Sequence, residues 1–166
     1  MRALLFFFLS LVLCATTRAA EPLASHGVVL LQPSVVVQER VPSVDAMADY
    51  IKAIEAATRE AVAGSPARQS VGGFIVVAVR PGLKAKAWLD FDTLVDLDLQ
   101  RQIATRVQAV PPFAAKDGPV VFAIKVALWD GKPSKRQVPL PPEWRSATRD
   151  GAPQAVEALV QHLWPE

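Results

Sequence analysis

Hydrophobic and polar positions along the chain predict strands alternating with helices. Short apolar runs rich in β-branched residues are typical of strands, and apolar residues spaced three and four apart are typical of helices. Strand-like runs occur at residues 27–31, 35–37, 74–79, 83–91 and 120–129. Pro33 separates the first two runs, which predicts either an edge strand or a strand broken in two.

Helical spacing occurs in three segments. The first, 44–63, follows Ser43, a suitable N-cap, and its apolar stripe comprises Val44, Met47, Ile51, Ile54, Thr58 and Val62. The second, 97–110, ends at the proline pair Pro111–Pro112. The third is a short C-terminal helix, 153–164.

A β-hairpin over residues 73–91 is the clearest structural signal, with its turn at Arg80–Gly82. In the second strand one face is apolar, whereas Lys84, Lys86, Trp88 and Asp90 share the other face. Only one side of the sheet therefore needs a covering layer.

These elements predict an α+β fold of two layers. A small antiparallel sheet, formed by hairpin 73–91 and strand 119–129, is covered on one face by helices 44–63 and 97–110, and the C-terminal helix 153–164 is additional. Residues 132–150, rich in proline and charge, are expected to be ordered but irregular.

The N-terminus predicts a cleavable secretory signal over residues 1–19. Arg2 gives a positive start, residues 3–14 are almost all apolar, and Thr17-Arg18-Ala19 favours cleavage after Ala19. The apolar run is shorter than the roughly 20 residues that span a bilayer. We therefore expect no membrane anchor, a single soluble domain over 20–166, and a periplasmic location.

Cys14 raises the alternative of a lipoprotein, but the preceding Leu11-Val12-Leu13 puts a bulky leucine where lipoprotein processing needs a small residue. Without the signal the chain has no cysteine, which excludes disulfides, thiolate metal sites and a cysteine nucleophile. The full chain has 18 Lys+Arg and 16 Asp+Glu, and removing Arg2 and Arg18 leaves 16 of each. This balance gives no argument for a nucleic-acid partner.

The block from about residue 50 to 129 resembles the C-terminal domain of the TonB/TolA family. The matching pieces are Tyr50-Ile51-Lys52, the strand–turn–strand unit, the helix that follows, Val110-Pro111-Pro112-Phe113 and the next strand. The resemblance implies a core domain at about 44–130, a C-terminal extension at 131–166 and a function in binding other proteins. Energy transducers of that family also keep a membrane anchor and a long spacer, which this chain lacks.

Chemistry-bearing motifs are scarce. His26 and His162 lie near opposite ends of the expected domain, and neither has a neighbour at a metal-ligand spacing. Nucleophile motifs and phosphate-binding glycine loops are missing from the sequence. We therefore expect no enzyme activity, no metal and no cofactor.

One acidic cluster is open to two interpretations: Asp90, Asp92, Asp96 and Asp98. Carboxylates at this spacing could bind Ca²⁺ or act as an acid/base pair. Aspartate is also a preferred helix N-cap, and the glycine and closing glutamate of a calcium loop are missing. Structural capping is the favoured interpretation.

The candidate binding residues are aromatic and basic: Lys84, Lys86, Trp88, Trp129 and Trp144. Tryptophan is enriched in binding hot spots. The alternation places Trp88 and Trp129 on the polar face, where they either form a recognition surface or pack beneath residues 132–150, and packing is favoured.

The sequence thus favours a non-enzymatic interaction module. We expect it to bind another envelope protein by pairing an edge strand with an extended segment. The same edge could pair two copies of the chain into a homodimer. The alternative is a small-ligand or cell-wall-binding protein that uses the face rich in tryptophan and lysine.

Overall fold

The computed structural model describes residues 19–152 and 155–165, and it contains one four-stranded antiparallel sheet. Residues 1–18 of the predicted signal therefore lie outside the described residues. The strand order is β1-β4-β2-β3, so β1 and β3 are the edges. The strands are β1 (Leu23–Leu30), β2 (Val71–Arg80), β3 (Lys84–Phe91) and β4 (Val120–Leu128). The predicted α+β class with an antiparallel sheet is confirmed.

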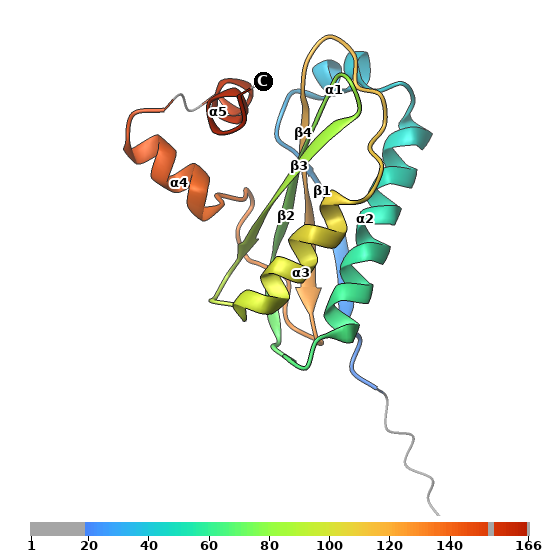
Figure 1. Cartoon of the computed structure of the whole chain (residues 1–166), viewed down its shortest axis with the longest axis vertical. Coiled ribbons are helices and arrows are strands. Elements are labelled where there is room, and N and C mark those ends of the chain that lie inside the picture. The colour runs from blue at the N-terminus through green and yellow to red at the C-terminus, as the bar shows by residue number, and fades with distance from the viewer. Residues whose placement is uncertain (1–18, 153–154, 166) are drawn as a thin grey trace, which may run out of the picture.

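Two long helices cover one face of the sheet (Figure 1). They are α2 (Val44–Gly64) and α3 (Leu97–Gln108). Ser43 caps α2, as predicted, by accepting a hydrogen bond from the Ala46 amide at 3.1 Å. Their apolar stripes meet alternate residues of β2 and β4 in the main core, although Val44, placed in the stripe by its spacing, is 73% exposed.

The opposite face of the sheet is also covered, which corrects the expectation of two layers. The helices α4 (Pro142–Arg149) and α5 (Val156–Leu163) stand on that side (Figure 1). They bury a second apolar cluster, made of Phe74, Val76, Ala78, Trp88, Val121 and Ala123 from the sheet and of Trp144, Ala147, Leu159 and Val160 from the helices. Both faces of β2 and β4 are therefore inside the protein.

Two local predictions were wrong. Residues 35–37, expected to be extended, lie in the helix α1 (Ser34–Arg40), where Val37 is buried in the main core. Burial of Val37 in this seven-residue helix outweighs the strand preference of three consecutive valines. Residues 132–150, expected to be irregular throughout, contain α4, whose Trp144 and Ala147 are buried.

Glycine at position 72 allows a close crossing of two segments. A Cβ atom there would lie 2.6 Å from the Ser134 amide nitrogen and 2.9 Å from the Pro133 carbonyl carbon. Residues 132–140, here called the strap, can therefore pass directly over the start of β2. The strap leads from β4 to α4.

No helix within the described ranges, 19–152 and 155–165, has the length and apolar character needed to cross a bilayer.

Candidate strand-binding groove and the clusters around it

The outer edge of β3 offers backbone groups for pairing. The amide of Asp92 donates to the carbonyl of Gly72 at 2.9 Å, and this bond shows which residues of β3 form hydrogen bonds with β2. Ladder bonds of an antiparallel pair involve every second residue. The peptide groups of Ala85, Ala87 and Leu89 consequently point away from β2.

A groove runs along this edge between α3 and α4. It has a volume of about 350 Å³, and its lining comprises Ala87, Trp88, Leu89, Leu97, Gln100, Arg101, Ala104, Pro142 and Glu143. Most of these contribute apolar surface, and Leu97 is 70% exposed. At one end of the groove the side chain of Gln108 makes a long contact, 3.5 Å, to the Ala85 carbonyl. Among the described residues no hydrogen bond reaches the outward groups of Ala87 or Leu89.

The other edge strand, β1, is interrupted. Its pairing with β4 shifts register between Ser25 and Val28, and Gly27 has a φ of 108° there. Bulges of this kind protect sheet edges against further pairing. The bulge divides β1 into two short regular pieces, Leu23 to Ser25 and Val28 to Leu30. Strand β3 pairs with β2 along its whole length without interruption.

Three of the predicted binding residues lie on β3. Lys84 is exposed next to the turn, whereas Lys86 is half-buried, donates to the carbonyl of Leu163 at 3.2 Å, and lies 5.3 Å above the Trp88 ring. All three side chains share the face of the sheet on which α4 and α5 lie, as the alternation predicted. Neither lysine pairs with a carboxylate among the described residues.

Trp88 and Trp144 form a buried pair. Each is 4% exposed, and their rings meet edge to face with centroids 5.4 Å apart. Packing, the favoured interpretation for Trp88, agrees with this burial, except that its cover is a helix. The indole nitrogen of Trp144 is buried without a hydrogen-bond partner among the described residues.

Trp129 does not join them. It has a left-handed φ of 48°, which ends the alternation of β4 and directs the ring into the main core, against the guanidinium of Arg68. The predicted shared face of Trp88 and Trp129 is therefore wrong.

The acidic cluster is divided between two structural tasks. Asp96 caps α3, accepting from the amides of Asp98 and Leu99 at 3.1 and 3.0 Å. Asp90, 3% exposed, accepts from Arg136 and from the Leu140 amide, both at 2.6 Å. The capping interpretation is thus confirmed for Asp96, whereas Asp90 binds the strap.

Arg136 joins the strap to β3. Its guanidinium bonds Asp90 at 2.6 Å and Asp92 at 2.9 Å. Burial alone would lower the pKa of Arg136, but the hydrogen bonds and charges of the two aspartates raise it above its ordinary value. Both carboxylates therefore contact the guanidinium that joins the strap to the end of β3.

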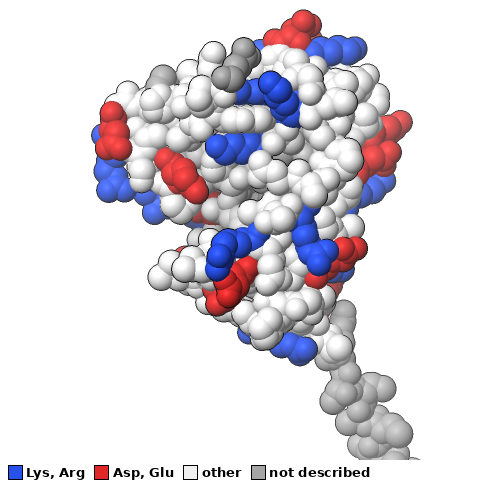
Figure 2. Space-filling model, viewed as in Figure 1, with Lys and Arg blue, Asp and Glu red and all other residues white. Residues whose placement is uncertain are grey.

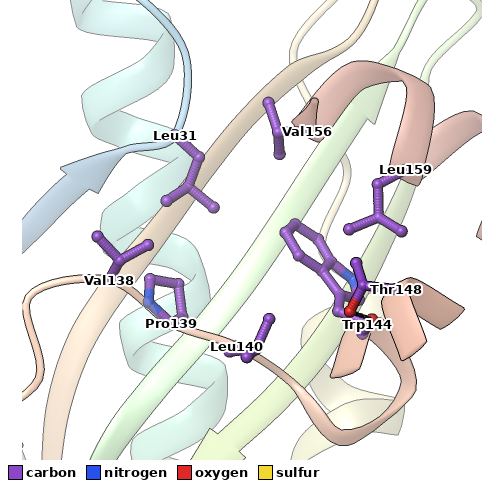
Figure 3. Close-up of a pocket in the computed structure, with 8 residues that line it drawn as sticks. All are labelled: Leu31, Val138, Pro139, Leu140, Trp144, Thr148, Val156 and Leu159. Carbon is purple, nitrogen blue, oxygen red and sulfur yellow. Dashed lines mark hydrogen bonds between the residues drawn. The ribbon is translucent and has the colours of Figure 1, made fainter. Parts of the chain in front are cut away.

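A separate apolar pocket lies over the second face of the sheet (Figure 3). Its volume is about 460 Å³, and its lining comprises Leu31, Val138, Pro139, Leu140, Trp144, Thr148, Val156 and Leu159. The hydroxyl of Thr148 donates to the Trp144 carbonyl at 3.0 Å. Within the part of the chain that the structure describes, this pocket has no charged lining residue, and the one hydroxyl that lines it already donates a hydrogen bond.

Within residues 19–152 and 155–165, no three His, Cys, Asp or Glu side chains come together in a way that could hold a metal ion. Charges of both signs are interspersed on the face shown in Figure 2. Comparison with family models, with curated proteins and with solved structures finds no match to this chain.

Proposed function

We propose that this protein is a non-enzymatic binding module that pairs β3 with an extended segment of another protein. The carrying observation is the row of outward peptide groups at Ala87 and Leu89 inside a groove between two helices. In strand addition, main-chain hydrogen bonds supply affinity and flanking pockets supply specificity. The β3 groove has both components.

The partner is an envelope protein in this proposal, and the chain is exported to the periplasm through its N-terminal signal. Membership of the TonB/TolA family remains a prediction from the sequence. From α2 to β4 the order is helix, strand, strand, helix, strand. Tyr50 meets Phe113 of the Pro-Pro-Phe segment edge to face, with centroids 5.6 Å apart.

The direct test is capture of partners from an envelope extract by the wild type and by two proline variants. Ala87→Pro removes an outward amide of β3 and leaves the inward ladder bonds in place. Val28→Pro is the matched control on the edge of β1. We expect capture to be lost in Ala87→Pro and kept in Val28→Pro, with both variants folded by circular dichroism. Capture that survives Ala87→Pro, or fails equally in both variants, would count against pairing at β3.

A second pair of variants covers the case that Ala87→Pro does not fold. Leu97 borders the groove and is 70% exposed, so Leu97→Glu places a charge at the binding surface at little cost to stability. Val44, 73% exposed on α2, gives the control Val44→Glu. Selective loss of capture in Leu97→Glu supports the groove, and equal capture by both variants contradicts it.

Binding of a small apolar ligand is the second candidate function, and the 460 Å³ pocket favours it. Ligand pockets have volumes of roughly 300–1,000 Å³ and mainly apolar linings. Trp144 lines this pocket, so its fluorescence should change when the protein is titrated with fatty acids of increasing chain length. A flat response would remove this candidate. The tryptophan pair itself is buried and offers no open stacking surface for cell-wall sugars.

A further inference from the structure

We propose that the segment paired with β3 alternates acidic and apolar residues, with its acidic residues opposite Lys84 and Lys86. This inference rests on the proposed pairing at β3 and specifies the chemistry of the partner. It follows from the way the two faces of β3 differ in charge and cover.

The two faces of β3 impose different demands on a neighbouring strand. Side chains alternate between the faces of a sheet, and residues directly opposite on adjacent strands share a face. Partner residues opposite Ala85, Ala87 and Leu89 therefore lie on the side of α3. Those opposite Lys84, Lys86 and Trp88 lie on the side of α4 and α5.

On the α4/α5 side, the turn end of β3 is basic. Among residues 19–152 and 155–165, the exposed Lys84 has no carboxylate partner, and Lys86 has only the Leu163 carbonyl as a hydrogen-bond acceptor. The nearby cation Arg101, by contrast, is already paired with Asp98. Two lysines at positions i and i+2 would meet two partner residues with the same spacing.

The lysine positions are also those where partner side chains come closest. Every second residue of β3, counted back from Asp92, forms hydrogen bonds with β2, and these residues include Lys84 and Lys86. An antiparallel strand added on the outer side would therefore face the two lysines in non-hydrogen-bonded pairs. Cα atoms in such pairs are about 4.5 Å apart, closer than in hydrogen-bonded pairs. An aspartate or glutamate opposite each lysine gains roughly 1.4- to five-fold in affinity per pair.

The other end of the groove excludes acidic residues. Glu143 lines the groove together with Trp88 and Leu89. Glu143 lies on α4, and a partner carboxylate placed beside it would be repelled by its like charge. The acidic positions are therefore confined to the lysine end of the segment.

On the α3 side the groove selects apolar residues. Ala85 and Ala87 are small and half-buried, and Ala87 lines the groove together with Leu97 and Ala104 of α3. Small side chains on β3 leave room for larger side chains from the partner strand. The favoured partner segment therefore has the sequence pattern acidic–apolar–acidic–apolar where it lies beside the two lysines.

Selection from a displayed library of random peptides tests this inference with the intact chain from residue 20. Three proteins are used as bait: the wild type, Lys84→Glu and, as a matched charge reversal away from β3, Lys116→Glu. We expect wild type and Lys116→Glu to enrich peptides with acidic residues spaced by two and apolar residues between them. Lys84→Glu should lose that acidic preference at one position and accept lysine or arginine there.

The outcomes separate the inference from the proposed function. The inference is overturned, and pairing at β3 still stands, if the enriched peptides carry no acidic bias but compete with one another and do not bind the Leu97→Glu variant. An acidic bias that Lys84→Glu does not change would also overturn it. Failure of every bait to enrich peptides that depend on Leu97 would overturn the pairing itself. In the expected case, raising the salt from 50 to 500 mM weakens selected peptides about ten-fold on wild type and less on Lys84→Glu.

Discussion

Replacing Trp144 with alanine tests whether the second layer contributes to the stability of the whole domain. Trp144 belongs to α4, is 4% exposed, and packs edge to face on Trp88. Around the pair lie Phe74, Val121 and Leu159, so the substitution empties the centre of the second cluster. The cavity it leaves lies between α4 and the sheet.

The expected loss in the free energy of unfolding is about 3 kcal/mol. Substitutions of buried Phe or Trp by Ala cost roughly 3–5 kcal/mol. The low end applies because the indole nitrogen of Trp144 is buried without a partner among the described residues, so its removal also relieves a desolvation penalty. Domains of this size have roughly 5–15 kcal/mol in total, so the loss is large but leaves the protein folded.

Urea unfolding followed by far-ultraviolet circular dichroism and by tryptophan fluorescence measures this loss. Leu94→Ala is the control, because Leu94 is 89% exposed and its truncation should change the free energy by less than about 0.5 kcal/mol. Coincident transitions with a loss of about 3 kcal/mol are expected for Trp144→Ala. A loss below about 1 kcal/mol, or a fluorescence transition at lower urea than the dichroism transition, would refute the view that α4 is an integral layer.

Further predictions concern the strap, the core and the crossing at β2. Asp90→Asn should lower the free energy of unfolding by roughly 2 kcal/mol, because it neutralises one side of a largely buried ion pair. Asp98→Asn, in an exposed pair, should lower it by less than about 0.5 kcal/mol, and chemical denaturation measures both values. Burial raises the pKa of Tyr50 from 10.0 to about 12, so its contribution to the free energy of unfolding is fully present below pH 10 and falls by roughly 2–3 kcal/mol as the pH rises toward 12. Tyr50→Phe should flatten this decline, and an unchanged decline would contradict the view that Tyr50 causes it. Gly72→Ala should lower stability by roughly 1–3 kcal/mol, because its Cβ would meet the strap backbone, whereas Gly64→Ala has open space and should raise stability or leave it unchanged in thermal melts.

The elements of the main core could be predicted from the sequence because their signals are local. The stripe Leu99–Ile103–Val107 of α3 and the alternation of β3 each depend on neighbours within one element. The cap at Ser43 is likewise a local signal. Such patterns keep their meaning whatever the rest of the chain does.

The remaining features could not be predicted because distant residues decide them. The valines of α1 favour a strand by themselves, and only the burial of Val37 against the main core makes the helix. The helix α4 follows three prolines and has a mostly polar composition, so nothing local showed that Trp144 would cover Trp88.

For the candidate site, the alternation placed Lys84, Lys86 and Trp88 on one face of a strand. That this strand is an edge depends on the order of all four strands, which no local pattern contains. Leu97 and Pro142 border the groove from two helices that are far apart in the sequence. Sequence reasoning therefore reached the strand but not the groove.

Hydrogen exchange of individual β3 amides, measured by nuclear magnetic resonance with and without a peptide selected on the wild type, tests the central claim most directly. The account predicts that the Ala87 and Leu89 amides exchange quickly in the free protein, while those of Trp88 and Asp90 are protected by β2. Addition of the peptide should slow Ala87 and Leu89 at least ten-fold. Amides of Ala87 and Leu89 that are already protected in the free protein, or that remain fast in the complex, would contradict pairing at β3.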